Sequence, residues 1–163
     1  MRPQDIVVLL KIITMDRVEW RNIDIANAIR LSPSEVSEAL NRCKIARLID
    51  SRKKEVHKNS FREFLIYGLK YVFPVEPGAI VKGIPTAHSA YPIRDHIIGG
   101  ENYVWQHAKG RLRGQAIEPL YHTIPDVIDS NPALYELLVV IDTLRVGRAR
   151  EVQIARQELE KRI

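Results

Sequence analysis

Five polar side chains recur at helical spacing in the first third of the sequence. They are Ser34, Ser37, Glu38, Asn41 and Arg42. Residues three and four positions apart share one face of a helix, so these side chains would project together. Asn suits the donor and acceptor of adenine, Arg suits guanine, and an acid accepts from the amino group of cytosine. The pattern predicts a helix face that reads DNA bases; the alternative is an ordinary helical hairpin with a solvated outer face.

The helix that would present this face runs from Pro33 to Cys43. Ser32 is a favourable N-cap, proline suits the first helical position, and Glu35 stands where the acid of a capping box reaches back. We therefore leave Glu35 out of the base-reading set. The opposite stripe is apolar and consists of Val36, Ala39, Leu40 and Cys43. Cys43 is the only cysteine, so no disulfide framework is available, and we expect it to pack in the core.

The preceding segments would hold this helix in place. Asp24 to Arg30 has the apolar spacing of a short helix, and only Leu31 and Ser32 separate it from the next one. An earlier helix opens at Pro3, and its inner face carries Ile6, Leu9, Leu10 and Ile13. The polar residues 16–19 break that helix, and Trp20 is expected to anchor the turn. Two short helices joined by a tight turn indicate a helix-turn-helix.

A polar basic turn, Asp50 to Lys54, follows the apolar pair Leu48 and Ile49 and precedes a second short extended segment. The order helix, helix, helix, hairpin is that of a winged helix. We expect phosphate contacts beside the base-reading helix and at the tip of this wing. The residues are Arg21, Asn22, Ser32, Arg52, Lys53 and Lys54.

The charge distribution favours the same end of the chain. The 163 residues carry a formal net charge of +5. Residues 1–72 hold fourteen Lys or Arg against nine Asp or Glu, whereas residues 73–163 hold eleven of each. The whole basic surplus therefore lies in the part expected to neutralise phosphates.

The remaining elements predict a mainly α fold with small β elements. A helix that starts at Ser60, with Glu63 completing a capping box, would close a winged helix-turn-helix domain over 1–72. The extension 73–163 begins with an extended Pro/Gly-rich segment. Tyr103–Trp105 and Leu112–Ile117 then flank a polar turn and predict a β-hairpin. Two helices complete the chain: one that opens at Asn131-Pro132, and a charged one after Gly147.

The first of these two helices is apolar nearly all round, more than a small domain needs for its own core. We expect it to join a homodimer, with the first helix of the chain contributing. The predicted interface residues are Leu134, Leu137, Leu138, Ile141 and Leu144.

The sequence gives no pattern for catalysis. Thr86, His88 and Ser89 lie together, but Ser and His neighbours in sequence do not place a nucleophile against its base. We expect a loop whose polar groups bond local backbone. The histidines lack ligand spacing and no phosphate-binding glycine motif occurs, so we expect no enzyme, no metal and no cofactor. No apolar run approaches a membrane span and no signal peptide is evident, so we expect a cytoplasmic protein.

The stretch DIANAIRLSPSEVSEALNRC, with Ala46–Ile49 and the Arg52–Lys54 turn, resembles winged-helix regulators of the MarR type over roughly the first 70 residues. The resemblance implies that the helix Pro33–Cys43 enters the major groove, that the wing touches the minor groove or its phosphates, and that the protein is a dimer. The second half is similar to tails of poorly characterised bacterial helix-turn-helix proteins, from which no activity transfers.

Two functions remain open from the sequence. The first is a bacterial sequence-specific transcriptional regulator, a dimeric repressor that binds double-stranded DNA. The alternative is an antitoxin-like interaction protein that binds a partner protein through residues 73–163 and represses its own operon.

Overall fold

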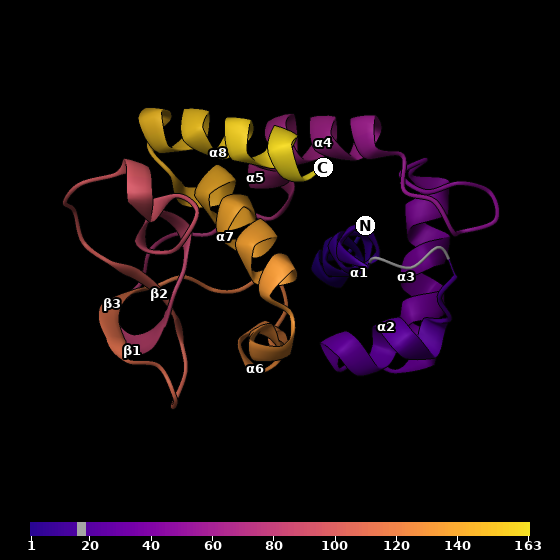
Figure 1. Ribbon diagram of the computed structural model, residues 1–163, viewed down its shortest axis with the longest axis horizontal. Coiled ribbons are helices and arrows are strands. Elements are labelled where there is room, and N and C mark those ends of the chain that lie inside the picture. The colour runs from indigo at the N-terminus through magenta and orange to yellow at the C-terminus, as the bar shows by residue number, and fades with distance from the viewer. Residues whose placement is uncertain (16–18) are drawn as a thin grey trace.

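The protein is mainly helical and carries one small sheet, as the computed structural model of residues 1–15 and 19–163 shows (Figure 1). The sheet with its loops lies at one end, and α2 (Asn22–Ile29) and α3 (Pro33–Ile45) with the following turn lie at the other. Helices α7 (Pro132–Val146) and α1 (Pro3–Thr14) stand between these two ends. Across one side run α8 (Ala149–Arg162) and α4 (Lys58–Tyr67).

The first three helices occur in the predicted order. They are α1, α2 (Asn22–Ile29) and α3 (Pro33–Ile45), and each packs against the other two. Ile6, Leu9 and Leu10 of α1 are buried, as predicted. Trp20 is also buried, which confirms its expected role as an anchor, whereas residues 16–18 of the predicted polar break lie outside the described residues.

The chain after α3 turns back on itself through a short bridge. Ile49 pairs with Val56 in an antiparallel β-bridge, and the polar turn of residues 50–55 connects the two. The next helix, α4, begins at Lys58 and not at Ser60, so the predicted capping box of Ser60 with Glu63 is wrong. Gly68 separates α4 from the single turn α5 (Leu69–Val72).

The sheet differs from the predicted hairpin. Strands β2 (Tyr103–Gln106) and β3 (Leu112–Ala116) pair in parallel, and each is antiparallel to β1 (Ile80–Pro85). The prediction that β2 and β3 form a β-hairpin is therefore wrong, because the Pro/Gly-rich segment supplies their antiparallel partner. The three strands close on themselves.

Glycine makes this closure possible. A Cβ atom on Gly83 would stand 2.0 Å from the carbonyl oxygen of Trp105, and one on Gly110 would stand 2.2 Å from the carbonyl carbon of Gly83. Contacts this short are not tolerated between real atoms, so the backbones approach only where no side chain intervenes.

The two halves of the chain share one hydrophobic core. The last part begins with α6 (Ile124–Val127), and α7 then contacts α1, α4, α5 and α8. Asn131, where α7 opens as predicted, donates from Nδ2 to the carbonyl oxygen of Ala28 at 3.1 Å. Within the described residues, no helix is both long enough and apolar enough to span a bilayer.

Candidate nucleic-acid interface

The start of α3 is fixed by the capping box that its sequence predicts. The backbone N–H of Glu35 donates to Oγ of Ser32 at 3.1 Å, and Oε2 of Glu35 accepts from the backbone N–H of Ser32 at 2.9 Å. These bonds with Ser32 lower the pKa of the Glu35 carboxyl. Both side chains therefore hold the helix terminus, which confirms the predicted capping box.

The outer face of α3 presents most of the predicted base-reading side chains to solvent. Ser34, Glu38 and Asn41 are exposed and Ser37 is half-buried. The opposite face packs into the core through Val36, Ala39, Leu40 and Cys43. Burial raises the pKa of the Cys43 thiol to about 12, so this cysteine is a core residue, as its position in the stripe predicts.

Arg42 takes a different role from the one predicted. Its guanidinium binds the Asp5 carboxylate in a bidentate manner, with Nε 2.9 Å from Oδ2 and one terminal nitrogen 2.7 Å from Oδ1. Asp5 is 0% exposed, and 23% of the Arg42 side chain is exposed. The guanidinium is already engaged with a buried acid, so we remove Arg42 from the base-reading set. A signal existed in the sequence, since Asp5 is an acid on the same stripe as Leu9 and Ile12.

Cationic side chains flank the exposed face of α3. Arg21 is exposed at the start of α2 and lies 3.6 Å from Asp24, while Asn22 is half-buried as the first residue of that helix. At the other end of α3, Lys44 and Arg47 are exposed cations that the predicted set of DNA-contacting residues does not include. Ile45, between them, is 82% exposed. Their position at the end of the predicted helix was the signal available.

The turn of residues 50–55 is organised by one carboxylate that the sequence did not single out. Oδ1 of Asp50 accepts the backbone N–H groups of Lys54 at 2.6 Å and Glu55 at 2.9 Å. The bonds to the N–H groups of Glu55, Lys54 and Arg52 lower the pKa of Asp50 to about 2. A depressed carboxyl pKa stabilises the folded turn above the ordinary range near pH 4, and this contribution disappears as the pH falls through about 2.

The three predicted wing cations are not equivalent. The Arg52 side chain is 82% exposed, and its Nε lies 3.4 Å from Oδ2 of Asp50. Lys53 sits at the tip with a positive φ of 59° and is half-buried. Lys54 reaches back: its Nζ donates to the carbonyl oxygen of Trp20 at 2.7 Å and lies 4.2 Å from the centre of the indole.

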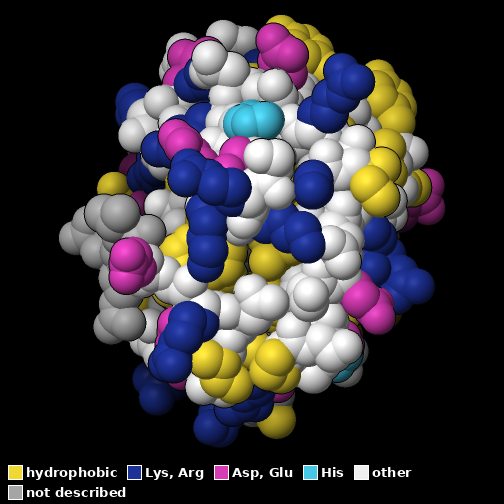
Figure 2. All heavy atoms as spheres, turned by 90° about the vertical axis from the view of Figure 1, so that its right-hand side faces the viewer, with side chains coloured by type: hydrophobic (Ala, Val, Ile, Leu, Met, Phe, Trp, Pro, Cys, Tyr) yellow, Lys and Arg dark blue, Asp and Glu magenta, His cyan; other side chains and the backbone are white. Residues whose placement is uncertain are grey.

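The face that carries these elements is shown in Figure 2, viewed from the side of α2 and α3. Lys and Arg side chains are spread across it, with Asp and Glu and small hydrophobic areas among them. This surface is polar and rich in cations, which is what contact with a phosphate backbone requires.

The loop of Thr86, His88 and Ser89 forms internal contacts. Oγ of Ser89 accepts from the backbone N–H of Tyr103 at 2.9 Å, and Nε2 of His88 bonds the carbonyl oxygen of Glu101 at 2.8 Å. Both bonds go to backbone, but to residues 13 and 14 positions away, so the prediction that these side chains bond local backbone is wrong. Thr86 differs, since its hydroxyl donates to the buried Asp142 of α7 at 2.8 Å.

The predicted dimer residues of α7 lie inside the single chain. Leu134, Leu137, Leu138, Ile141 and Leu144 are each at most 4% exposed. Their burial accounts for the apolar character of α7 without a second subunit. The homodimer stays a prediction from the sequence, and an interface would have to use other side chains.

Among the described residues, no group of three or more His, Cys, Asp and Glu side chains is arranged to hold a metal ion. Comparisons with protein-family models, curated proteins and solved structures give no match to this chain.

Proposed function

We propose that this chain is a winged helix-turn-helix protein that binds double-stranded DNA in a sequence-specific manner and regulates transcription. The observation that carries the proposal is the exposed polar face of α3, with Ser34, Glu38 and Asn41 outward and cations at both of its ends. The bridged turn after α3 supports it, because a short basic hairpin in that position suits a second contact with DNA.

In this arrangement α3 lies in the major groove and reads base edges through Ser34, Ser37, Glu38 and Asn41. Arg21, Asn22 and the wing residues contact phosphates and fix the register of the helix. The first experiment is selection from a random duplex library, followed by fluorescence anisotropy at fixed salt. We expect an enriched motif that binds at least about 10³-fold more tightly than random DNA. Equal affinity for selected and random duplexes would contradict sequence-specific binding.

Asn41 is expected to contribute specificity. Asn41→Ala should weaken binding to the selected duplex by about 1 to 3 kcal/mol and relax the preference at one base pair, because the amide can pair in a bidentate manner with adenine. Anisotropy on the selected site and its single-base variants measures this. Gln157→Ala, an exposed amide on α8, is the matched control and should leave binding unchanged. Equal losses on specific and random DNA would remove Asn41 from the reading set.

Lys53 at the wing tip is expected to act through charge alone. Lys53→Ala should weaken binding to all sequences alike and lower the slope of log K against log salt by about 1, since one phosphate contact is lost. Lys70→Ala on α5 removes an exposed cation outside the proposed interface and serves as the control. An unchanged salt slope after replacing Arg52, Lys53 and Lys54 together would mean that the turn does not touch DNA.

The alternative function, an antitoxin-like protein that binds a partner through residues 73–163, has one supporting observation. Ile98 is fully exposed in the second half, and Ile80 and Tyr91 are also exposed large apolar side chains. A stable complex recovered with the chain, and lost on Ile98→Asp, would favour this function.

A further inference from the structure

A loop of the second half lies against the turn between α2 and α3. Oγ1 of Thr123 donates to the carbonyl oxygen of Ile29, the last residue of α2, at 2.8 Å. A terminal nitrogen of Arg30, the next residue, lies 3.7 Å from Oδ2 of Asp126 in α6. Figure 1 shows α6 beside α2, and the two helices are in contact. The loop of residues 118–123 therefore stands close to the start of α3, although no DNA contact has been assigned to its half of the chain.

Two rings of this loop lie near the first turn of α3. Tyr121 is half-buried, His122 is exposed, and their ring centres are 4.4 Å apart. The bonds with Ser32 lower the pKa of the Glu35 carboxyl, and the charge of a protonated His122 lowers it further. Burial raises the pKa of the Tyr121 hydroxyl, and the charge of Glu35 adds to that rise. The loop therefore borders the end of α3 at which the capping box lies.

The turn between β2 and β3 reaches the same surface. Nδ1 of His107 accepts the backbone N–H of Lys109 at 3.2 Å, so the neutral ring carries its proton on Nε2. That nitrogen lies 3.0 Å from Oδ1 of Asp126 and donates to it. The bond from His107 lowers the pKa of the Asp126 carboxyl, and the charges of Arg30 and Lys109 lower it further. Two exposed cations, Arg30 and Lys109, therefore surround one carboxylate and leave a net positive charge here.

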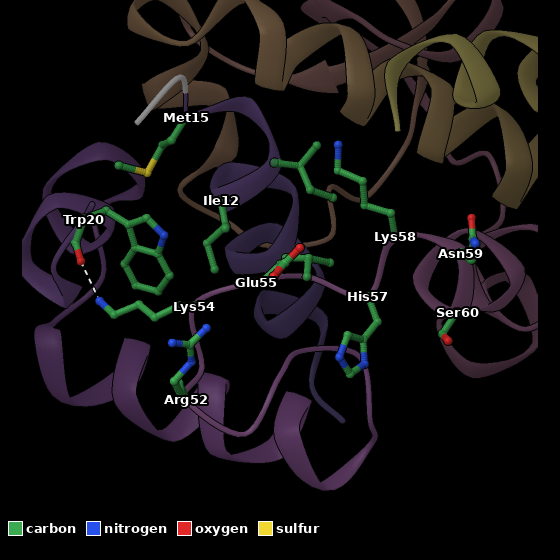
Figure 3. Close-up of a pocket in the computed structure, with 12 residues that line it drawn as sticks. Ile12, Met15, Trp20, Arg52, Lys54, Glu55, His57, Lys58, Asn59 and Ser60 are labelled. Carbon is green, nitrogen blue, oxygen red and sulfur yellow. Dashed lines mark hydrogen bonds between the residues drawn. The ribbon is translucent and has the colours of Figure 1, made fainter. Parts of the chain in front are cut away.

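The polar turn that follows the other end of α3 has much of its charge engaged within the protein. Nζ of Lys54 donates to the carbonyl oxygen of Trp20 at 2.7 Å, as Figure 3 shows. Nε of Arg52 lies 3.4 Å from Oδ2 of Asp50. A helix in the major groove has a phosphate backbone on each side, and contacts with both fix its register. Cations near the start of α3 are placed to contact phosphates that the polar turn does not reach.

We propose that Arg30 and Lys109 bind DNA phosphates beside the start of α3, so that the second half of the chain forms part of the DNA interface. This pair, the α6 contact, rests on the proposed function, in which α3 lies in the major groove. Thr123 and Asp126 already attach α6 to α2 in the free protein. The two cations are therefore positioned in advance, and little ordering free energy is lost when DNA binds.

The first experiment measures the salt dependence of binding to a random duplex by fluorescence anisotropy. Lys109→Met should lower the slope of log K against log salt by about 1, and Arg30→Met with Lys109→Met should lower it by about 2, because each change removes one phosphate contact. Lys70→Met on α5 removes an exposed cation elsewhere and should leave the slope unchanged. An unchanged slope in the folded double variant would overturn the α6 contact.

A second measurement uses the unmodified protein and does not depend on how a variant folds. Lysine side chains are acetylated with a water-soluble ester, with and without saturating selected duplex, and the rates are compared by mass spectrometry. DNA should slow the labelling of Lys109 and Lys53 at least about threefold, because an amine paired with a phosphate stays protonated and unreactive. Lys70 should react at the same rate in both samples. Equal labelling of Lys109 with and without DNA would contradict the proposal, even if Lys53 is protected.

These measurements separate a failure of the α6 contact from a failure of the proposed function. If the salt slope falls for Lys53→Ala but not for Arg30→Met with Lys109→Met, the α6 contact is wrong and the proposed function stands. If the unmodified protein binds neither the selected nor the random duplex, both are wrong. A fall in slope for both variants, with Lys109 protected in the complex, is the result that we expect.

Discussion

Arg42→Met is expected to destabilise the fold by about 3 to 5 kcal/mol, because it leaves the buried Asp5 carboxylate without its guanidinium partner. Asp5 is fully buried, and among the described residues the only other bond to its side chain comes from the backbone N–H of Arg2, 2.7 Å from Oδ2. One N–H group cannot compensate for a charge removed from water. Urea unfolding followed by circular dichroism measures the loss.

A double variant separates the cost of the unpaired charge from the value of the pair. Asp5→Leu combined with Arg42→Met should recover most of the lost stability, since replacing both partners by apolar side chains leaves no buried charge. Arg30→Met is the matched control: Arg30 lies 3.7 Å from Asp126 on an exposed surface. Its loss should change the unfolding free energy by less than about 1 kcal/mol.

DNA binding by the same variant distinguishes the structural role from base reading. At a temperature where Arg42→Met is folded, it should retain the base preference of the unmodified protein. A variant that is as stable as the unmodified protein but no longer discriminates one base pair would return Arg42 to the reading set that the sequence predicts.

Local signals on α3 and α7 were readable from the sequence because all their partners are near in the chain. Ser32, Pro33 and Glu35 fix the start of α3 within one turn, and Asn131-Pro132 opens α7. The burial of Cys43 could be predicted from helical periodicity alone. The base-reading and phosphate-contacting roles stay predictions.

The features that sequence reasoning missed depend on distant partners. The Arg42 guanidinium binds Asp5, which lies thirty-seven positions earlier in the chain. The hairpin prediction for β2 and β3 failed because a local turn competes with β1, whose residue Gly83 pairs with both strands. The apolar surface of α7 looked excessive only because the segments that cover it lie throughout the chain.

A second buried carboxylate, Asp142 of α7, is expected to matter as much as Asp5. It is 2% exposed, and burial raises its pKa while its hydrogen bonds and Arg145 oppose that rise. Oδ2 accepts from Thr86 at 2.8 Å and from the indole N–H of Trp105 at 2.7 Å, and Oδ1 accepts from Arg145 at 2.8 Å. One side chain therefore connects α7 with β2 and with the loop after β1.

Asp142→Ala should cost about 3 to 5 kcal/mol of unfolding free energy, because it leaves the Arg145 side chain, 4% exposed, without its carboxylate. Within the part of the chain that the structure describes, Arg145 would then keep two hydrogen-bond partners, the carbonyl oxygens of Phe73 at 3.0 Å and Glu118 at 3.1 Å. Thr86→Val removes a single donor and should cost less, about 1 to 3 kcal/mol. Glu160→Ala, an exposed acid on α8, is the control and should have little effect.

The readout for this network is the unfolding transition followed by the fluorescence of Trp105 in a Trp20→Phe background, because the chain has two tryptophans. Loss of the carboxylate should free the indole N–H and loosen the attachment of the closed sheet to α7, so the emission should shift to longer wavelength at lower urea than in the unmodified protein. The loss of unfolding free energy should decrease in the order Asp142→Ala, Thr86→Val, Glu160→Ala. Each change in this order leaves fewer buried partners unsatisfied than the one before it. Equal stability of Asp142→Ala and Glu160→Ala would show that the sheet is held to α7 by apolar packing alone.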